Sequence, residues 1–266
     1  MRHIGINRLS LGMQSAHQAE LSLFGRWHTF QEVIGAVETA RRVGFDNISL
    51  DLIYGVPHQT CEMWRATLQA ALDLAPDHFS IYALILESGT EITRRIKHKE
   101  LPMPDEDLTA DMYDDATMML ANANYPQYEI SSWGKPSEHN LQYWRNLPYL
   151  GLGAGAHGYI HRIRTVNVMR PEIYIRRMQS LERDMRFPLT PATMRHEHLD
   201  EATDMAETLF MGLRLLNEGV SLSGFKARYG IDLQVRFGAE IQKLIGQNLL
   251  VIDNDRLKLT KRARLI

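Results

Sequence analysis

The sequence has one cysteine, no long apolar run and almost no net charge, and each of these shortages excludes a class of protein. Cys61 stands alone among 266 residues, so the chain can build neither an intramolecular disulfide nor a zinc or iron–sulfur site from several of its own thiols. Apolar runs such as residues 82–86 fall well short of the roughly 18 residues of a membrane span. The 30 basic and 32 acidic residues nearly cancel, which leaves no overall field for holding nucleic acid. We therefore expect a cytoplasmic protein with no membrane span and no nucleic-acid partner.

Three consecutive strand–helix units are predicted within the first 90 residues. Strand-like runs at 8–14, 48–54 and 78–84 alternate with segments whose apolar residues recur at helical spacing, which is typical of a parallel sheet. The first run would lie at the edge of such a sheet and expose unpaired backbone groups. We therefore expect that this edge is covered by another chain, or that these residues are the remainder of a longer protein.

The later sequence changes in character, and three parts are predicted in all. They are a partial barrel at 1–100, a linker helix and lid region at 101–190, and a C-terminal domain at 191–266. The middle part combines a helix from about residue 105 with a strand at 127–132 and a glycine-rich segment at 149–159. Together with the parallel sheet, this order predicts an α/β fold followed by an α+β domain.

The C-terminal part has the outline of a winged helix. A long helix from about Glu197 is predicted to end at Gly219, and two short helices then precede a hairpin that turns at residues 254–255. The charges on the second short helix are balanced, with Arg236 and Lys243 opposed by acidic neighbours. This surface is too neutral to follow a phosphate backbone, so we expect a packing or docking domain.

Polar residues stand near the ends of the predicted parallel strands, where ligand sites of such sheets lie. Gln14 can bind an amide or a ribose, Asp51 can accept from a ribose hydroxyl or an amine, and Arg26 can pair with a carboxylate. Together they suit a zwitterionic nucleoside. The alternative is a buried Asp51 satisfied by backbone amides, with Arg26 on a solvated surface.

A second group of candidate residues lies in the segment HNLQYW. It combines His139, Asn140, Tyr143 and Trp144. A histidine can ligate haem iron or move a proton, and large aromatic rings form walls for a planar ligand. The alternative is a hydrogen-bonded histidine in a loop whose aromatic neighbours fill the core, and the same two interpretations apply to His157.

Several segments together resemble those of one family. They are GINRLSLGMQS (5–15), DLIYGVPHQT (51–60), HFSIYALILESGT (78–90), YEISSW (128–133), HNLQYW (139–144) and YLGLGAGAH (149–157). On these motifs the chain resembles, over nearly its whole length, the HemN/HemW family of radical S-adenosylmethionine proteins. This family comprises oxygen-independent coproporphyrinogen III oxidases and related haem chaperones, and HNLQYW is similar to the HNxxYW motif of the HemW branch.

The resemblance implies a fold and a set of site residues. The fold is the C-terminal half of a partial (β/α)6 radical SAM barrel, followed by a HemN C-terminal domain with a winged-helix-like end. Gln14, Arg26 and Asp51 fall on positions that contact S-adenosylmethionine, and Ile85 falls near a further adenosyl contact. The haem candidates are His139 as an iron ligand or shaper of the site, Asn140 beside it, and Tyr143 and Trp144 as walls.

The sequence also departs from the family pattern. Family members carry a CxxxCxxC triplet that binds a [4Fe-4S] cluster and a GGGTP segment that holds the methionyl amine, and neither occurs here. Residues 5–15 match the fourth barrel strand, so the chain resembles an N-terminally truncated member. Without three cysteines the chain cannot hold the cluster, which we therefore expect only in full-length relatives. Without the cluster it has no source of a 5'-deoxyadenosyl radical.

Three functions follow as expectations. The first is a HemW-like haem chaperone that passes haem to haem-accepting proteins and whose full-length relatives bind S-adenosylmethionine. The alternatives are an oxygen-independent coproporphyrinogen III oxidase, against which HNLQYW argues, and a non-catalytic binding remnant. We also expect self-association through the exposed half barrel.

Overall fold

The computed structural model describes residues 1–179 and 186–265, which form two compact units, 1–136 and 137–264. The elements of the first unit are η1 (Arg2–Ile4), β1 (Leu9–Gln14), α1 (Gln18–Leu23), α2 (Phe30–Arg42), β2 (Ile48–Tyr54), α3 (Cys61–Asp73), β3 (His78–Ala83), α4 (Glu91–Lys97), α5 (Glu106–Asn122), β4 (Gln127–Glu129) and β5 (Ser132–Gly134). The predicted α/β class is confirmed, whereas the three-part division stays a prediction.

The first unit is built on a five-stranded sheet with the order β1-β2-β3-β5-β4. Strands β1, β2 and β3 are parallel, as predicted, and β1 lies at the edge. The single strand predicted at 127–132 is wrong, because the chain turns after Glu129 and forms two short antiparallel strands. The Glu129 carboxylate accepts a hydrogen bond from the backbone N–H of Ser131 at 3.0 Å, which stabilises that turn.

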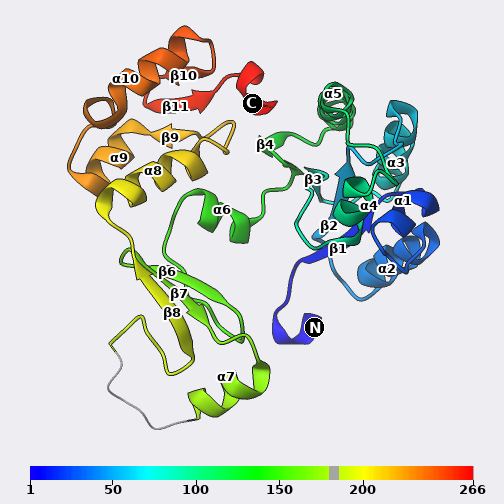
Figure 1. Cartoon of the computed structure of the whole chain (residues 1–266), viewed down its shortest axis with the longest axis horizontal. Coiled ribbons are helices and arrows are strands. Elements are labelled where there is room, and N and C mark those ends of the chain that lie inside the picture. The colour runs from blue at the N-terminus through cyan, green and yellow to red at the C-terminus, as the bar shows by residue number, and fades with distance from the viewer. Residues whose placement is uncertain (180–185, 266) are drawn as a thin grey trace. The chain divides into compact units, whose positions relative to one another are not determined.

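Helices α2, α3 and α5 pack their apolar sides on one face of this sheet (Figure 1). Alternation along β2 turns Leu50 and Leu52 into that core, where both are fully buried. The indole of Trp64 on α3 donates to the carbonyl of Met112 on α5 at 2.7 Å and joins the two helices. The opposite face of the sheet carries the polar residues of β1, β2 and β3, among them Ser10, Asp51 and Ser80.

The second unit contains two three-stranded antiparallel sheets, β6-β7-β8 and β10-β11-β9. Its elements are α6 (Glu138–Trp144), β6 (His157–Ile160), β7 (Ile163–Asn167), α7 (Pro171–Met178), β8 (Thr193–His198), α8 (Glu201–Gly212), β9 (Val220–Ser221), α9 (Leu222–Tyr229), α10 (Leu233–Gly246), β10 (Leu250–Asp253), β11 (Arg256–Leu259) and η2 (Lys261–Leu265). None of the helices among the described residues is long and apolar enough to cross a membrane.

The winged-helix outline of the C-terminal residues is confirmed, with the hairpin turning after Asp253 as predicted. The predicted long helix is wrong at both ends, because β8 occupies the residues before Leu199 and α8 ends at Gly212. Gly219 instead precedes β9 with a φ of 57°, in the left-handed region. A Cβ there would lie 2.3 Å from the carbonyl oxygen of Leu257, so the close approach of β11 requires glycine at this position.

Candidate functional site

The sheet face opposite the helices, here called the inner face, has the carboxylate of Asp51 at its centre. Its oxygens accept from the Ser10 hydroxyl at 2.8 and 3.0 Å, and Ser49 lies 3.5 Å away. Asp51 is thus held by serine hydroxyls from its own and the neighbouring strand. Burial raises the pKa of this carboxyl, and the hydrogen bonds from Ser10, Ser80 and Ser49 oppose that effect.

Gln14 ends β1 in an unusual backbone conformation. Its φ is 63°, in the left-handed region, which costs of order 1 kcal/mol or more for a residue other than glycine. The Gln14 side chain folds back over Gly12. Its Nε2 lies 2.7 Å from the position that a Cβ at Gly12 would occupy. Gly12 pairs with Asp51 across the sheet, so the amide of Gln14 lies over the row that contains Asp51.

Two loops at the carboxyl end of the sheet are joined by a buried polar group. Glu20 on α1 accepts from the Ser15 hydroxyl at 2.6 Å and from the Gln59 amide at 3.1 Å. The Gln59 side-chain oxygen accepts from the backbone N–H of Gly55, directly after β2. These contacts fix the loops that follow β1 and β2 and thereby the rim around Gln14.

Arg26 and Ile85, the other two S-adenosylmethionine candidates, lie in loops that follow α1 and β3. Both side chains are exposed, as is Trp27, which is 98% exposed. Among the described residues, no hydrogen bond or ion pair joins Arg26 to Gln14 or Asp51. The structure thus gathers Gln14 and Asp51 and leaves the remaining two candidates on the open rim.

His78 is a buried polar residue on the same sheet face that was not singled out from the sequence. It is fully buried on β3, with Nδ1 2.8 Å from the Ser49 hydroxyl and Nε2 2.9 Å from the Tyr128 hydroxyl. Burial, aided by the nearby charge of Arg8, lowers the pKa of His78 to about 3, so the imidazole is neutral at pH 7. The period-2 alternation of the parallel strands places His78 on the face of Asp51, and this signal was readable in the sequence.

The second group of candidates lies on α6, whose first turn is capped by the Ser137 hydroxyl accepting from the backbone N–H of Asn140. His139 and Tyr143 stand one helical turn apart, with His139 Nε2 3.2 Å from the Tyr143 hydroxyl and ring centroids 5.0 Å apart. The Tyr143 ring in turn meets Tyr149 edge-on at 4.6 Å. The structure therefore brings His139 and Tyr143 together beside a further aromatic ring.

Trp144 points away from this pair. Its ring lies under the guanidinium of Arg214, 4.4 Å from ring centroid to Cζ, and lines a hollow of about 250 Å³ with Leu215 and Phe225. Its Nε1 is buried and has no hydrogen-bond partner among the described residues. Trp144 thus joins α6 to the C-terminal part of this unit, on the side opposite the exposed His139.

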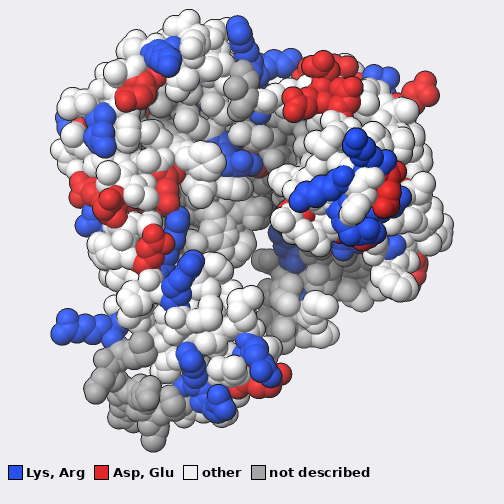
Figure 2. Space-filling view, in the orientation of Figure 1, with Lys and Arg blue, Asp and Glu red and all other residues white. Residues whose placement is uncertain are grey.

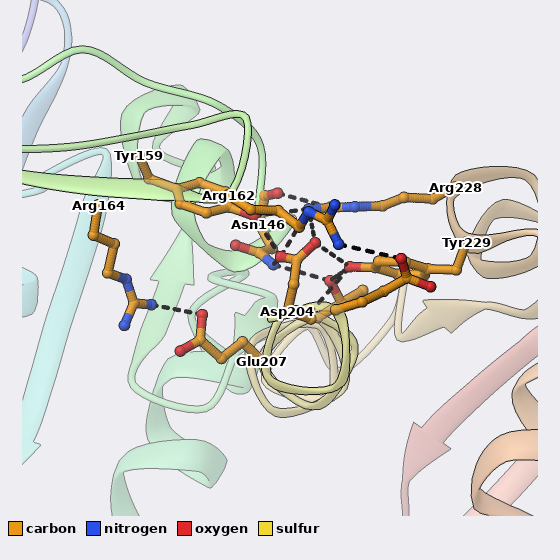
Figure 3. Close-up of polar contacts among 10 residues, drawn as sticks. Asn146, Tyr159, Arg162, Arg164, Asp204, Glu207, Arg228 and Tyr229 are labelled. Atoms are coloured by element: carbon orange, nitrogen blue, oxygen red, sulfur yellow. Dashed lines mark hydrogen bonds and ion pairs between the residues drawn. The ribbon is translucent and has the colours of Figure 1, made fainter. Parts of the chain in front are cut away.

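The chain directly after α6 is held by a buried carboxylate, that of Asp204 on α8 (Figure 3). Asn146 has a φ of 47° and ends the helix in the left-handed region, which asparagine tolerates. Its side-chain amide donates to Asp204 at 3.0 Å and to Thr208 at 2.9 Å. Its backbone carbonyl accepts from Arg228 at 2.8 Å, so both ends of the residue are fixed.

Asp204 also binds the residues around Asn146. The Arg228 guanidinium lies 3.2 Å from its carboxylate, the Tyr229 hydroxyl donates at 2.9 Å, and the Tyr159 hydroxyl donates as well. Burial and the Asp204 acceptor raise the pKa of Tyr159 to about 12, so the phenol stays protonated as a donor. Sequence reasoning missed this network because nothing in the local pattern marks partners that lie 58 and 82 residues from Asn146.

Two family models match the chain, the Radical SAM superfamily at residues 1–71 and the HemN C-terminal domain at residues 199–266. The heme chaperone HemW of Bacillus subtilis is 36% identical over 269 residues, which cover 100% of this chain and 69% of that protein. The chain belongs to the HemN/HemW family. The heme chaperone HemW of Lactococcus lactis is also 36% identical, over 97% of this chain and 66% of its own length.

The solved structure of Escherichia coli coproporphyrinogen III oxidase, HemN, superposes on the present chain with a TM-score of 0.77. The match covers 99% of the present chain and 63% of the HemN chain. The sequence identity is 22%, so this likeness shows the fold alone. The fold inferred from the resemblance is thereby confirmed. The chain spans about two thirds of the length of the HemW proteins that it matches.

Proposed function

We propose that this chain binds haem and passes it to haem-accepting proteins, as a member of the HemW branch of its family. The observation that carries the proposal is the exposed His139 beside Tyr143 and Tyr149. No hydrogen bond engages Nδ1 of His139 among the described residues, so this imidazole has a nitrogen free to ligate iron. The HemW relatives at 36% identity are named as heme chaperones, which supports the same function here.

Each motif residue has a proposed part. His139 ligates the iron, Asn140 lies next to it in the first turn, and the ring of Tyr143 forms a wall for the porphyrin. Trp144, which the sequence predicts as a second wall, packs under Arg214. Its contacts favour a part in holding α6 in place.

The inner face of the parallel sheet is the proposed S-adenosylmethionine site. Asp51 suits the ribose hydroxyls and Gln14 the adenosyl group, with Arg26 for the methionyl carboxylate and Ile85 for a further adenosyl contact. The half-buried, hydrogen-bonded Asp51 and the buried Gln14 suit such a ligand. S-adenosylmethionine supplies a sulfonium and an adenosyl group when bound.

A [4Fe-4S] cluster does not fit the residues of this chain. Cys61, its single thiol, begins α3 and packs partly buried against the core. Burial raises the pKa of this thiol, which is opposite to what a thiolate ligand needs. We therefore derive no radical step from these residues.

The oxidase alternative, coproporphyrinogen III oxidation, rests on the fold shared with HemN at 22% identity. That reaction needs the radical for which this chain has no cluster ligands. The HNLQYW segment and the 36% identity to the HemW relatives favour the chaperone function.

A haem titration tests the proposal. Iron(III) protoporphyrin is added to the chain and to His139→Ala, and the Soret band is followed. We expect His139→Ala to weaken binding at least about tenfold, or 1.4 kcal/mol, and to shift the band, because an iron ligand is lost. His98→Ala, which removes an exposed histidine after α4, is the control and should bind as the unaltered chain does. Equal titrations for His139→Ala and His98→Ala would remove His139 from the site.

A further inference from the structure

One face of the β6-β7-β8 sheet carries a row of charged and aromatic side chains. The antiparallel register sets Val166 between His157 and Arg195. In the next row on the same face, it sets Arg164 opposite Glu197. Residues paired in this way share a face of the sheet. With Tyr149 they line a hollow of about 300 Å³.

The two arginines of this hollow differ in their partners. Arg164 forms an ion pair with Glu207 at 2.6 Å, so its charge is largely compensated (Figure 3). Arg195 is exposed and has no ion-pair or hydrogen-bond partner among residues 1–179 and 186–265. Figure 2 shows acidic and basic side chains interspersed over the face in view, in line with the nearly balanced charge of the whole chain. Any anion held here would be held by direct contact with Arg195.

Aromatic contacts connect this hollow to α6. Tyr149 lines the hollow and meets the Tyr143 ring at 4.6 Å, and Tyr143 meets His139 at 5.0 Å. Tyr149 is also paired through its backbone with Tyr159 of β6, with N–O distances of 2.7 and 2.8 Å. Two ring contacts therefore lead from the proposed iron ligand to Tyr149, which lines the same hollow as Arg195.

We propose that Arg195 binds a propionate carboxylate of the porphyrin, with the compensated Arg164 beside it. The proposal rests on the proposed haem function and adds a second contact point to it. A porphyrin has an apolar macrocycle, which suits packing against the rings of Tyr143 and Tyr149. Its carboxylates lie at the edge of the macrocycle and would extend past the two tyrosines. The planar guanidinium matches a carboxylate with two parallel hydrogen bonds, which a lysine cannot offer.

The test compares Arg195→Gln with Arg176→Gln in the full chain. Both remove one exposed arginine from the same unit, and Arg176 on α7 lies outside the hollow. Each variant is titrated with iron(III) protoporphyrin and with its dimethyl ester, in which both carboxylates are capped. We expect Arg195→Gln to bind haem about tenfold more weakly than Arg176→Gln, and both to bind the ester alike.

A third variant predicts a change of opposite sign. Glu197→Gln removes a carboxylate that shares the face with Arg195 and would repel a propionate, so it should bind haem more tightly than the unaltered chain. Metal-free protoporphyrin separates the two contacts, because the effect of Arg195→Gln should persist and that of His139→Ala should vanish.

Equal haem affinities for Arg195→Gln and Arg176→Gln would overturn the proposal, as would an ester that binds the unaltered chain as tightly as haem does. In that case haem binding itself, and with it the proposed function, would stand. If the unaltered chain binds neither porphyrin, the proposed function fails and the carboxylate site fails with it.

Discussion

At the scale of single residues, Asp204 and His78 are buried polar groups whose roles differ. Asp204 bears the charge that balances Arg228 and holds the end of α6. His78 is neutral and joins Ser49 to Tyr128. Neither was singled out from the sequence. Strand alternation predicts the sheet face of His78, but the partners Tyr128 of His78 and Asn146 of Asp204 lie 50 and 58 residues away.

Asp204→Asn should destabilise the second unit strongly. The amide keeps the shape but leaves the Arg228 guanidinium without its anion, and losing one partner of a largely buried pair costs about 3 kcal/mol. Urea denaturation measures the loss. Asp253→Asn, which breaks an exposed pair with Lys258, is the control and should leave the midpoint unchanged. An Asp204→Asn midpoint equal to that of the control would show that the network does not stabilise the fold.

His78 makes a defined contribution to the pH dependence of stability. The unfolded chain binds a proton at His78 near pH 6.5, whereas the folded chain does so only near pH 3. The unfolded state therefore holds more protons in this window, and the free energy of unfolding falls as the pH drops, by up to about 1.4 kcal/mol per pH unit. His78→Gln should flatten this slope in denaturation curves between pH 6.5 and pH 4. An unchanged slope would mean that His78 is protonated in the fold.

At the scale of helices and strands, the sequence predicts well wherever local pattern and burial agree. The apolar run at residues 48–54 is β2 to the residue, and the hairpin turn follows Asp253 as expected. Strand β8 was missed because five of its six residues are exposed and show no apolar alternation. The predicted helix end at Gly219 failed because that glycine serves the approach of β11 and not a helix cap.

In the candidate site too, features set by local spacing could be predicted from the sequence, and features set by distant residues could not. The pairing of His139 with Tyr143 follows from their spacing of four residues on a helix, so it could be read from HNLQYW. The direction of Trp144 could not, since it depends on Arg214 and Phe225, which lie far along the chain. Gln14 and Asp51 share a sheet face by strand alternation, but the left-handed backbone at Gln14 has no counterpart in the local pattern.

At the scale of the whole molecule, the edge of β1 is its open side. No strand pairs with this edge among the described residues. The backbone N–H of Leu9 donates toward β2, to the carbonyl of Asn47, so by alternation that of Ser10 points to the open edge. An unpaired edge of this kind can add a strand from another chain.

We expect the 266-residue chain to self-associate with rising concentration, and size-exclusion chromatography with light scattering measures this. Ser10→Pro should lower the association, because proline removes the outward N–H without taking a bond from the ladder. Ser10→Ala is the matched control, since it loses the hydroxyl but keeps the N–H, and it should associate as the unaltered chain does. A chain that stays monomeric at every concentration would contradict the expectation.

The anchoring of α6 by α8 has a consequence for how the HNxxYW motif is interpreted in other proteins. The six letters of HNLQYW lie outside the matched HemN C-terminal domain, yet Asp204 and Thr208, which fix the end of its helix, lie within it. A protein that retained HNLQYW but lacked the HemN C-terminal domain would still match a search for the motif. Its histidine would sit on a seven-residue helix too short to hold its shape unaided. We therefore expect the motif to mark the proposed haem site only where the distant aspartate is also present.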